Sequence, residues 1–400
     1  MLQLGMVKFT ANSYILIEGT PATDRFFIIQ SGKCRSYITT GIPGHNQNTV
    51  LGPGDFIGVV SCMTGFSQNQ NVIAMTEVTV IAVRKDQYPD LIVQSTPVAM
   101  KIVHSFAQST RFLNSSVASI TTKSDVEDNK DHIFNVAQYY DEIGLSDIAY
   151  YCYYQYLKEN PDAPNKDACQ KKIDTFKMRS HAVYLDPVPD PVRSYPRDAM
   201  IFCEDQHGSD MFIIQDGQVK ISKIVGGKEV VYSILTKGAM FGEMALLENS
   251  PRSASAIAMT PVKLMTVNKA NFEQMITTQP QMIARLTSTL AERIWVLYRQ
   301  IISTAFKDPR ERLVDSLALM IEKSRQPMVK GTPFPTNMTP AEFVSFVGFP
   351  DEEKQNAMNK LMMDQNAKVI NGKVVVPDMV NCVKQAAFYR KQMQRQLGNE

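Results

Sequence analysis

The 400-residue sequence predicts an α+β protein with two β-barrels of the jelly-roll type, a helical hairpin inserted between them, and a C-terminal winged helix-turn-helix. Short alternating segments separated by glycine turns occur in two places, which is typical of barrels built from many short strands. A stretch with helical spacing lies between them, and a long amphipathic segment precedes a C-terminal pattern of two helices and a hairpin. The predicted domains are residues 1–120, 125–185, 186–305 and 306–400.

The clearest barrel pattern begins at Asp210. Residues 210–221 read as a strand, a tight turn at Asp216-Gly217 and a second strand, because apolar residues flank a turn pair. Gly226-Gly227 and Lys237-Gly238 punctuate the alternating segments that follow. Strands this short, with turns at such regular spacing, predict a closed all-β barrel.

Residues 241–256 carry the strongest functional pattern in the chain. Gly242-Glu243 opens a short apolar stretch, and Arg252 follows nine residues after the glutamate. An arginine guanidinium donates forked, charge-assisted hydrogen bonds to a phosphate, and glycine lets the backbone approach a ligand closely. The run resembles the phosphate-binding cassette of cyclic-nucleotide-binding domains. The alternative interpretation is a surface turn with one exposed arginine.

This resemblance implies a role for each cassette residue. Glu243 accepts a hydrogen bond from a ribose 2′-hydroxyl, Arg252 binds the cyclic phosphate, and Ala254 and Ala256 leave room under the sugar. The implied ligand-binding residues of the cassette are Gly242, Glu243, Met244, Ala245, Arg252, Ser253 and Ala254. The implied ligand is a cyclic nucleotide, cAMP or cGMP, bound without a metal ion.

The N-terminal segment repeats the barrel pattern, as a search for internal repeats shows. Residues 27–34 correspond to residues 212–219, and the glycine-bounded segment 54–58 corresponds to 238–242. Apolar strand-like segments follow in both places. We therefore expect residues 1–120 to form a second copy of the barrel.

The cassette chemistry has been lost from this first copy. Counting from the paired glycines places Val59, Gln68 and Asn69 at the positions of Glu243, Arg252 and Ser253. Because an amide does not neutralise a buried phosphate, we expect a structural barrel that binds no cyclic nucleotide. The alternative is a site for an uncharged or differently posed ligand.

Charge and composition set limits on the whole chain. The net charge of +2 supports no strong electrostatic attraction to nucleic acid or membranes. The sequence has no signal-peptide pattern at Met1 and no uninterrupted apolar stretch of membrane-spanning length. Its six scattered cysteines indicate reduced thiols rather than disulfides or a zinc site. We expect a cytoplasmic protein without a membrane span.

Residues 125–183 have helical spacing instead of strand alternation. The spacing of their small and apolar side chains resembles that of one tetratricopeptide repeat, which is a helical hairpin. The matching residues are Ile133, Val136, Ala137, Tyr140, Ala149, Tyr153, Tyr156 and Pro161. Five tyrosines cluster within residues 150–156. They either pack the hairpin against the barrels or form a surface for a partner protein.

A long helix is predicted over residues 281–305, which contain no glycine or proline and carry one apolar stripe. A shorter version of this helix is expected after the first barrel, around Val98, Ile102, Val103 and Phe106.

Residues 190–385 resemble the Crp/Fnr transcription regulators, in which a cyclic-nucleotide barrel leads into a long helix and a winged helix. Two barrels with two following helices predict internal pairing of the barrels, with a homodimer as the alternative.

The C-terminal region matches a helix-turn-helix and a wing. Thr339 with Glu342 predicts a capping box, Gly348 the turn, residues 351–366 the recognition helix, and Asn371-Gly372 the turn of the wing hairpin. The candidate DNA-contacting residues are Asp351, Glu352, Lys354, Gln355 and Lys360. Because carboxylates repel DNA phosphates, the acidic start of this helix also favours a protein partner.

The base of the nucleotide is expected to meet the long helix. In cAMP-responsive members of the resembled family a Thr-Ser pair binds the adenine, and the matching positions here are Leu297 and Tyr298. The sequence therefore does not distinguish cAMP from cGMP as the ligand.

We expect no enzymatic activity, and either a nucleotide-switched transcription regulator or a nucleotide-gated scaffold. A third hypothesis is a nucleotide that fills a structural site and does not switch the protein between two states.

Overall fold

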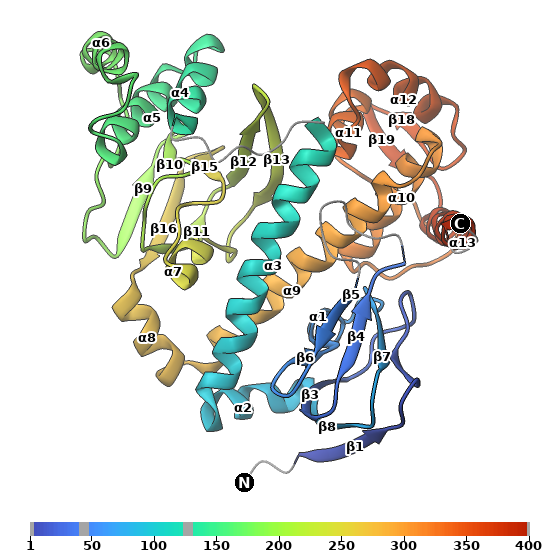
Figure 1. Cartoon of the computed structure of the whole chain (residues 1–400). Helices are drawn as coiled ribbons and strands as arrows, with labels where there is room; N and C mark the ends of the chain where they lie inside the picture. Colours follow the sequence, from blue (N-terminus) through green and yellow to red (C-terminus); the bar gives the residue numbers. More distant parts are fainter. Residues whose placement is uncertain (1–3, 40–47, 123–130, 398–400) are drawn as a thin grey trace. The chain divides into compact units, whose positions relative to one another are not determined.

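The computed structural model of the chain describes residues 4–39, 48–122 and 131–397 (Figure 1). The chain divides into two compact units, which are described separately. The first unit contains residues 1–88 and 291–400, and the second contains residues 89–290. No helix in the described ranges combines the length and hydropathy that a membrane crossing requires.

The second unit contains a barrel of two four-stranded antiparallel sheets, with strand orders β10-β15-β12-β13 and β14-β11-β16-β9. A six-residue helix, α7, connects β14 to β15. The elements are β9 (Val192–Tyr195), β10 (Met200–Phe202), β11 (Met211–Asp216), β12 (Val219–Val225), β13 (Lys228–Leu235), β14 (Met240–Phe241), α7 (Glu243–Glu248), β15 (Ser255–Ala258), β16 (Val262–Val267) and α8 (Lys269–Thr278). The predicted jelly-roll barrel is confirmed.

The first unit contains the second copy of this barrel. Its sheets have the orders β2-β7-β4-β5 and β1-β8-β3-β6, which repeat the other barrel strand for strand. The elements are β1 (Gly5–Phe9), β2 (Tyr14–Leu16), β3 (Arg25–Ser31), β4 (Cys34–Tyr37), β5 (Asn48–Leu51), β6 (Phe56–Ile57), α1 (Val59–Thr64), β7 (Asn71–Ala74), β8 (Val78–Arg84) and the 3₁₀ turn Lys85–Gln87. The repeat inferred from paired glycines therefore corresponds to a repeat in topology.

Helices α2 (Tyr88–Gln94) and α3 (Thr96–Thr122) follow the first barrel in sequence, but α3 belongs to the second unit. The expectation of a short helix here is wrong, because α3 has 27 residues and α9 has 25. The small polar residues 114–116 interrupt its apolar stripe, although no glycine or proline ends the helix before Thr122. The length of this helix was therefore not visible in the spacing of its apolar residues.

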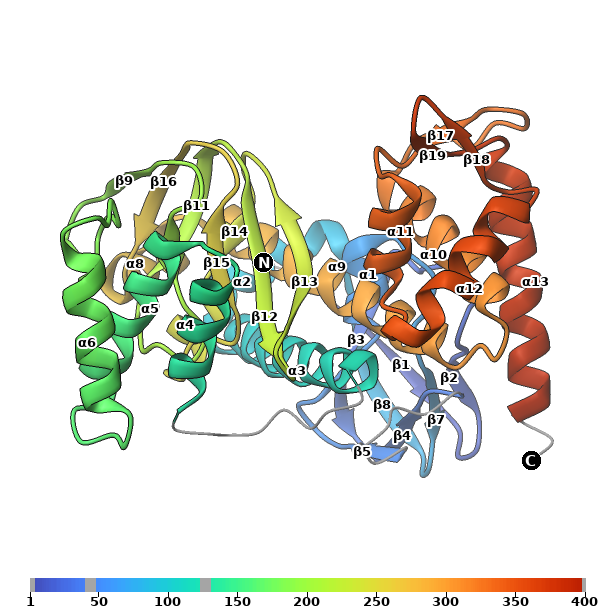
Figure 2. The ribbon, with the colours of Figure 1, turned by 90° about the horizontal axis from the view of Figure 1, so that it is seen from above.

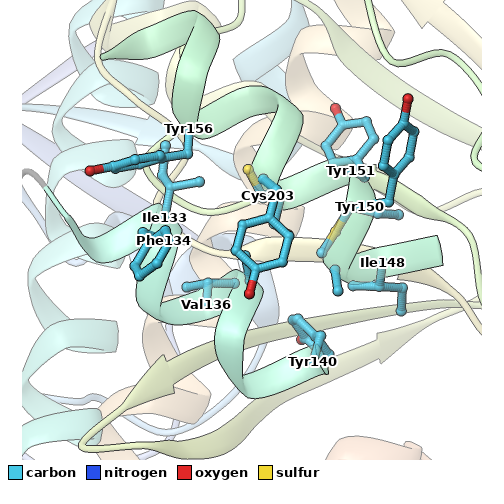
Figure 3. Packing of buried hydrophobic residues seen from close by; sticks show 14 of the residues in the cluster. Ile133, Phe134, Val136, Tyr140, Ile148, Tyr150, Tyr151, Tyr156 and Cys203 are labelled. Carbon is cyan, nitrogen blue, oxygen red and sulfur yellow. The ribbon is translucent and has the colours of Figure 1, made fainter. Parts of the chain in front are cut away.

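The helical insert consists of α4 (His132–Glu142), α5 (Ser146–Glu159) and α6 (Lys166–Lys177), so the predicted hairpin α4–α5 carries a third helix (Figure 2). Its core includes Tyr151, Tyr153 and Tyr156, each at most 2% exposed. Figure 3 shows Tyr151 and Tyr156 in this core. These side chains pack with barrel residues such as Cys203 and Ile257. The packing interpretation of the tyrosine cluster is confirmed, and the partner-surface interpretation is wrong for these buried rings.

The long helix α9 (Pro280–Thr304) matches its prediction within one residue and leads into the winged helix of the first unit. That domain contains α10 (Pro309–Ser324), β17 (Phe334–Pro335), α11 (Pro340–Val347), α12 (Asp351–Met363), β18 (Lys368–Ile370), β19 (Lys373–Val376) and α13 (Met379–Leu397). The capping box forms, since Thr339 Oγ1 accepts from Glu342 N–H at 3.2 Å and Glu342 Oε2 accepts from Thr339 N–H at 2.7 Å.

The turns of the winged helix also follow the sequence. Gly348 (φ 80°) joins α11 to α12, and Asn371-Gly372 (φ 49° and 73°) joins β18 to β19. The recognition helix ends three residues earlier than predicted. Asp364 caps its end and accepts from the backbone N–H of Asn366 at 2.7 Å, which turns the chain toward the wing.

Candidate functional site

The cassette of the second barrel folds around its arginine. Arg252 Nη1 donates to the carbonyl oxygen of Gly242 at 2.8 Å, and the hydroxyl of Ser253 lies 3.7 Å from the sulfur of Met244. The left-handed backbone of Gly242 (φ 78°) starts α7 at the next residue, Glu243, whose side chain is 1% exposed. The buried residues Ala245 and Ala254 complete this group, so the structure brings all seven predicted cassette residues together.

Arg252 is a cation enclosed by apolar surface. Its side chain lies over the ring of Phe202, with 4.2 Å between the guanidinium carbon and the ring centroid. Among the described residues Arg252 Nε has no hydrogen-bond partner. Burial lowers the pKa of Arg252 to about 10, while the carboxylates of Asp210 and Glu243 oppose this shift. The guanidinium remains charged at neutral pH and keeps a donor for an anionic ligand.

Two glycines make room for the guanidinium. A Cβ atom added to Gly208 would lie 2.7 Å from Arg252 Nη2, and one added to Gly242 would lie 2.8 Å from Arg252 Nη1. Gly242 was predictable from the cassette pattern, whereas Gly208 was not, because no local pattern links the loop before β11 to Arg252. Phe202 and Asp210 were missed for the same reason.

The loop that carries Gly208 is held by the helical insert. Gln206 accepts from the backbone N–H of Arg252 at 2.9 Å through its carbonyl, and from the hydroxyl of Tyr151 at 3.0 Å through its side chain. Asp210, at the end of the loop, pairs with the buried Arg193 at 3.0 Å. The tyrosine-rich helix α5 thus contacts a residue that positions Arg252.

A second link between the insert and the barrel is ionic. Glu204 is fully buried, accepts from the backbone N–H of Ile224 at 2.8 Å, and lies 2.9 Å from His132 Nε2. Burial alone would lower the pKa of His132, but the hydrogen bond and charge of Glu204, with the charge of Asp205, raise it above its usual value. This contact fixes the start of α4 on the barrel.

Helix α3 runs alongside the second barrel, beside β13, and contacts α7 of the cassette (Figure 1). Arg111 Nε pairs with Glu248 Oε2 at 2.6 Å, and both terminal nitrogens of Arg111 donate to the carbonyl oxygen of Pro251 at 3.1 Å. Further along α3, the carbonyl oxygen of Asn114 accepts from the hydroxyl of Tyr232 on β13 at 3.4 Å. The helix that follows the first barrel therefore covers the cassette of the second.

The reciprocal arrangement holds in the first unit. Trp295 on α9 stacks on Phe66, with ring centroids 4.2 Å apart, and its Nε1 donates to the carbonyl oxygen of Ser67 at 3.0 Å. Phe66 and Ser67 follow α1, the counterpart of α7. Each cassette region is thus contacted by the helix that follows the other barrel in sequence.

The predicted base contacts Leu297 and Tyr298 lie on the same part of α9, in the first unit, whereas Arg252 lies in the second. Leu297 is 7% exposed. Tyr298 is half-buried, and burial raises its pKa. Their role as base contacts stays a prediction.

The first-barrel cassette keeps the backbone and changes the side chains. Gly58 (φ 77°) starts the six-residue helix α1 as Gly242 starts α7, but a Cβ added to Gly58 would meet a methyl group of Leu16 at 3.1 Å instead of a guanidinium. Gln68 is 3% exposed, and neither atom of its amide has a hydrogen-bond partner in the described ranges. No cation therefore replaces Arg252 at this position.

The candidate DNA-contacting residues all lie on α12. Glu352, Gln355 and Lys360 are exposed and Lys354 is half-buried. Asp351 begins the helix, and its side chain lies outside the described part of the structure. Gln355 donates to Asn359 at 3.3 Å, one turn along the same exposed face.

Comparisons with known proteins agree with this geometry. The sequence family described as "Cyclic nucleotide-binding domain" matches residues 6–95 and 192–279, which are the two barrels. The chain is 27% identical over 137 residues to the cyclic AMP receptor protein of Thermus thermophilus, covering 34% of this chain and 63% of that protein. It is 27% identical over 187 residues to the cAMP-activated global transcriptional regulator CRP of Salmonella typhimurium, covering 46% and 88%.

Solved structures show partial likenesses. A CooA mutant from Carboxydothermus hydrogenoformans covers 49% of this chain and 87% of its own, with 17% identity and a TM-score of 0.41. The regulatory domain of Toxoplasma gondii PKA with cAMP covers 71% and 85%, with 16% identity and a TM-score of 0.22. The chain thus carries two copies of the cyclic nucleotide-binding domain and is similar in sequence to CRP-type regulators.

Proposed function

We propose that this protein is a regulator that binds one cyclic nucleotide, cAMP or cGMP, in its second barrel and controls its C-terminal winged helix in response. The observation that carries this proposal is the environment of Arg252. Its charged side chain is 5% exposed and held between two glycines, and its Nε has no partner among the described residues. Burying a cation in this way is costly unless an anion joins it.

The residues of the cassette fit a cyclic nucleotide. Arg252 supplies the charge and the donor for the cyclic phosphate, and Gly242 brings the backbone close. Glu243, buried beside them, supplies an acceptor for a ribose hydroxyl. The buried Ala254 and Ala256 leave space that larger side chains would fill.

The first barrel serves in this proposal as a structural partner that binds no cyclic nucleotide. Gln68 carries no charge, Val59 replaces the ribose-binding glutamate, and Leu16 lies against Gly58. The proposal includes internal pairing of the two barrels in one chain, with a homodimer as the alternative.

Calorimetric titration tests the proposal. The purified full chain, titrated with cAMP and with cGMP, should bind at least one of them at one site per chain, and Arg252→Ala should not bind. If wild type binds neither nucleotide, the proposed ligand is wrong. A stable dimer in light scattering would contradict the internal pairing.

The winged helix binds DNA in the first candidate function and a partner protein in the second. The second is favoured by apolar surface on α12 and the wing, where Met362, Met363 and Ile370 are 57%, 86% and 51% exposed. Met362 and Ile370 also line a cavity of about 330 Å³, together with Leu361 and Val374 among others. Exposed apolar residues of this kind are typical of protein-binding surfaces.

Selection on random DNA separates the two outputs. Enrichment of a sequence that depends on added nucleotide supports the DNA-binding regulator. If no sequence is enriched, and Met363→Lys abolishes nucleotide-dependent capture of a protein partner, the scaffold is supported instead. Lys360→Ala is the matched control, because it removes a phosphate contact from DNA binding but leaves the apolar surface in place.

A further inference from the structure

The loop that joins β10 to β11, residues 203–210, contacts both the backbone and the side chain of Arg252. The backbone N–H of Asp205 donates to the carbonyl oxygen of Arg252 at 2.8 Å, and the backbone N–H of Arg252 donates to the carbonyl oxygen of Gln206 at 2.9 Å. Two residues further on, a Cβ atom added to Gly208 would lie 2.7 Å from Arg252 Nη2. The position of this loop therefore sets the position of the guanidinium.

The loop needs contacts from outside it to keep its conformation. Asp205 has a left-handed backbone (φ 61°), which costs free energy in a residue other than glycine. Within the barrel, the side-chain oxygen of Gln206 accepts from the backbone N–H of Cys203 at 3.1 Å. This bond closes the start of the loop on itself and ties it to no other element.

Helix α5 of the insert holds the loop at two consecutive residues. The hydroxyl of Tyr151 donates to the side-chain oxygen of Gln206 at 3.0 Å. The carboxylate of Glu159 accepts from the backbone N–H of His207 at 3.1 Å and lies 2.6 Å from His207 Nδ1. Tyr151 and Glu159 are about two helical turns apart, so one side of α5 follows the loop as far as the residue before Gly208.

We propose that α5 clamps this loop, and that Tyr151 is a positioning residue for Arg252 in nucleotide binding. Tyr151 and the backbone of Arg252 bind two oxygens of the same residue, Gln206, which links the insert to the cassette. The inference rests on the proposed function, because it presupposes a cyclic nucleotide at Arg252. It assigns a role to the helical insert: packing of α5 and binding of the phosphate favour the same loop position, so each strengthens the other.

Two tyrosines of α5 provide a matched test. Tyr151 and Tyr153 are both buried, but the hydroxyl of Tyr153 donates to Asp141 within the insert, at 3.4 Å. Substitution by phenylalanine keeps each ring and removes one hydroxyl. In calorimetric titration of the full chain with cAMP and cGMP, Tyr151→Phe should weaken binding roughly twofold to tenfold, the effect of one neutral hydrogen bond. Tyr153→Phe should bind as wild type does.

Cyclic phosphorothioate analogues distinguish the positioning of Arg252 from a general loss of stability. In these analogues a sulfur atom replaces one exocyclic phosphate oxygen, and sulfur is a weak hydrogen-bond acceptor. Wild type should therefore bind at least one of the two diastereomers more weakly than the parent nucleotide. The ratio of the two affinities should be smaller in Tyr151→Phe, because its guanidinium is no longer held against that oxygen. A loss of stability would weaken both ligands equally and leave the ratio unchanged.

The results separate this inference from the proposed function. If Arg252→Ala abolishes binding while Tyr151→Phe and Tyr153→Phe bind equally well, the nucleotide site stands and positioning by Tyr151 is wrong. A phosphorothioate ratio that is equal in wild type and Tyr151→Phe also overturns the inference. If wild type binds neither nucleotide, the proposed function fails and the inference fails with it. Weaker binding in Tyr151→Phe alone, with a smaller phosphorothioate ratio, supports the clamp.

Discussion

Gln68 and Arg252 occupy the same backbone position in the two barrels. The backbone N–H of Gln68 donates to the carbonyl oxygen of Thr20 at 2.8 Å, and its carbonyl oxygen accepts from Gly19 N–H at 2.8 Å. The backbone N–H of Arg252 donates to the carbonyl oxygen of Gln206 at 2.9 Å, and its carbonyl oxygen accepts from Asp205 N–H at 2.8 Å. The same pair of hydrogen bonds thus holds a neutral amide in one barrel and a cation in the other, which makes the side chains a matched comparison.

Arg252→Ala should therefore abolish nucleotide binding and Gln68→Ala should leave it unchanged. Removing the charged partner of a buried phosphate costs about 2–5 kcal/mol, which corresponds to a loss of affinity of roughly thirtyfold to several thousandfold. Calorimetry with cAMP and cGMP measures both variants. Equal weakening by the two substitutions would show that the barrels do not divide their roles as proposed.

Gly208→Ala should weaken nucleotide binding without a change in fold. The added methyl group would lie 2.7 Å from Arg252 Nη2, so the guanidinium has to move away from the position that the cassette gives it. Gly52→Ala is the control, because no atom lies within 4 Å of a Cβ added there. An affinity of Gly208→Ala equal to that of wild type would mean that the position of the guanidinium is not set by this loop.

The contact between His132 and Glu204 should make the docking of α4 depend on pH. The pKa of His132 is raised in the folded state, so its stabilising effect is complete below about pH 6.5, the unfolded value, and is lost as pH rises through the folded pKa. Hydrogen exchange of α4 amides should therefore become faster, relative to His132→Gln, as pH increases through this range. Glutamine keeps a donor but does not titrate. A constant difference between the two proteins would contradict the assignment.

Trp295→Ala should destabilise the first unit by about 3–5 kcal/mol, since a large buried ring is removed from its stack on Phe66. Trp295→Phe should cost less, because it keeps a ring and loses mainly the hydrogen bond to Ser67. Chemical denaturation followed by hydrogen exchange in β7 and α1 measures both. Equal effects of the two substitutions would show that ring packing is not the main contribution.

Local chemistry explains which elements could be predicted from the sequence. The turn at Asn371-Gly372, the capping box of Thr339 and the cassette glycine Gly242 each need a particular residue at a particular spacing. Such requirements involve a few neighbouring residues, so they are visible without the fold. The repeat of the barrel was visible for the same reason, because its paired glycines recur at fixed positions.

The sequence by itself determined the two barrels, the winged helix and the identity of the buried cation. Periodicity, turn residues and charge each depend on residues that lie close together in the sequence. Only the tertiary structure decided that Gly208 lies on Arg252, that Tyr151 of α5 contacts the barrel, and that Arg111 closes over the cassette. These contacts join residues 44 to 140 positions apart, from loops and helices with no common pattern. Packing, which depends on the whole chain, selects such partners.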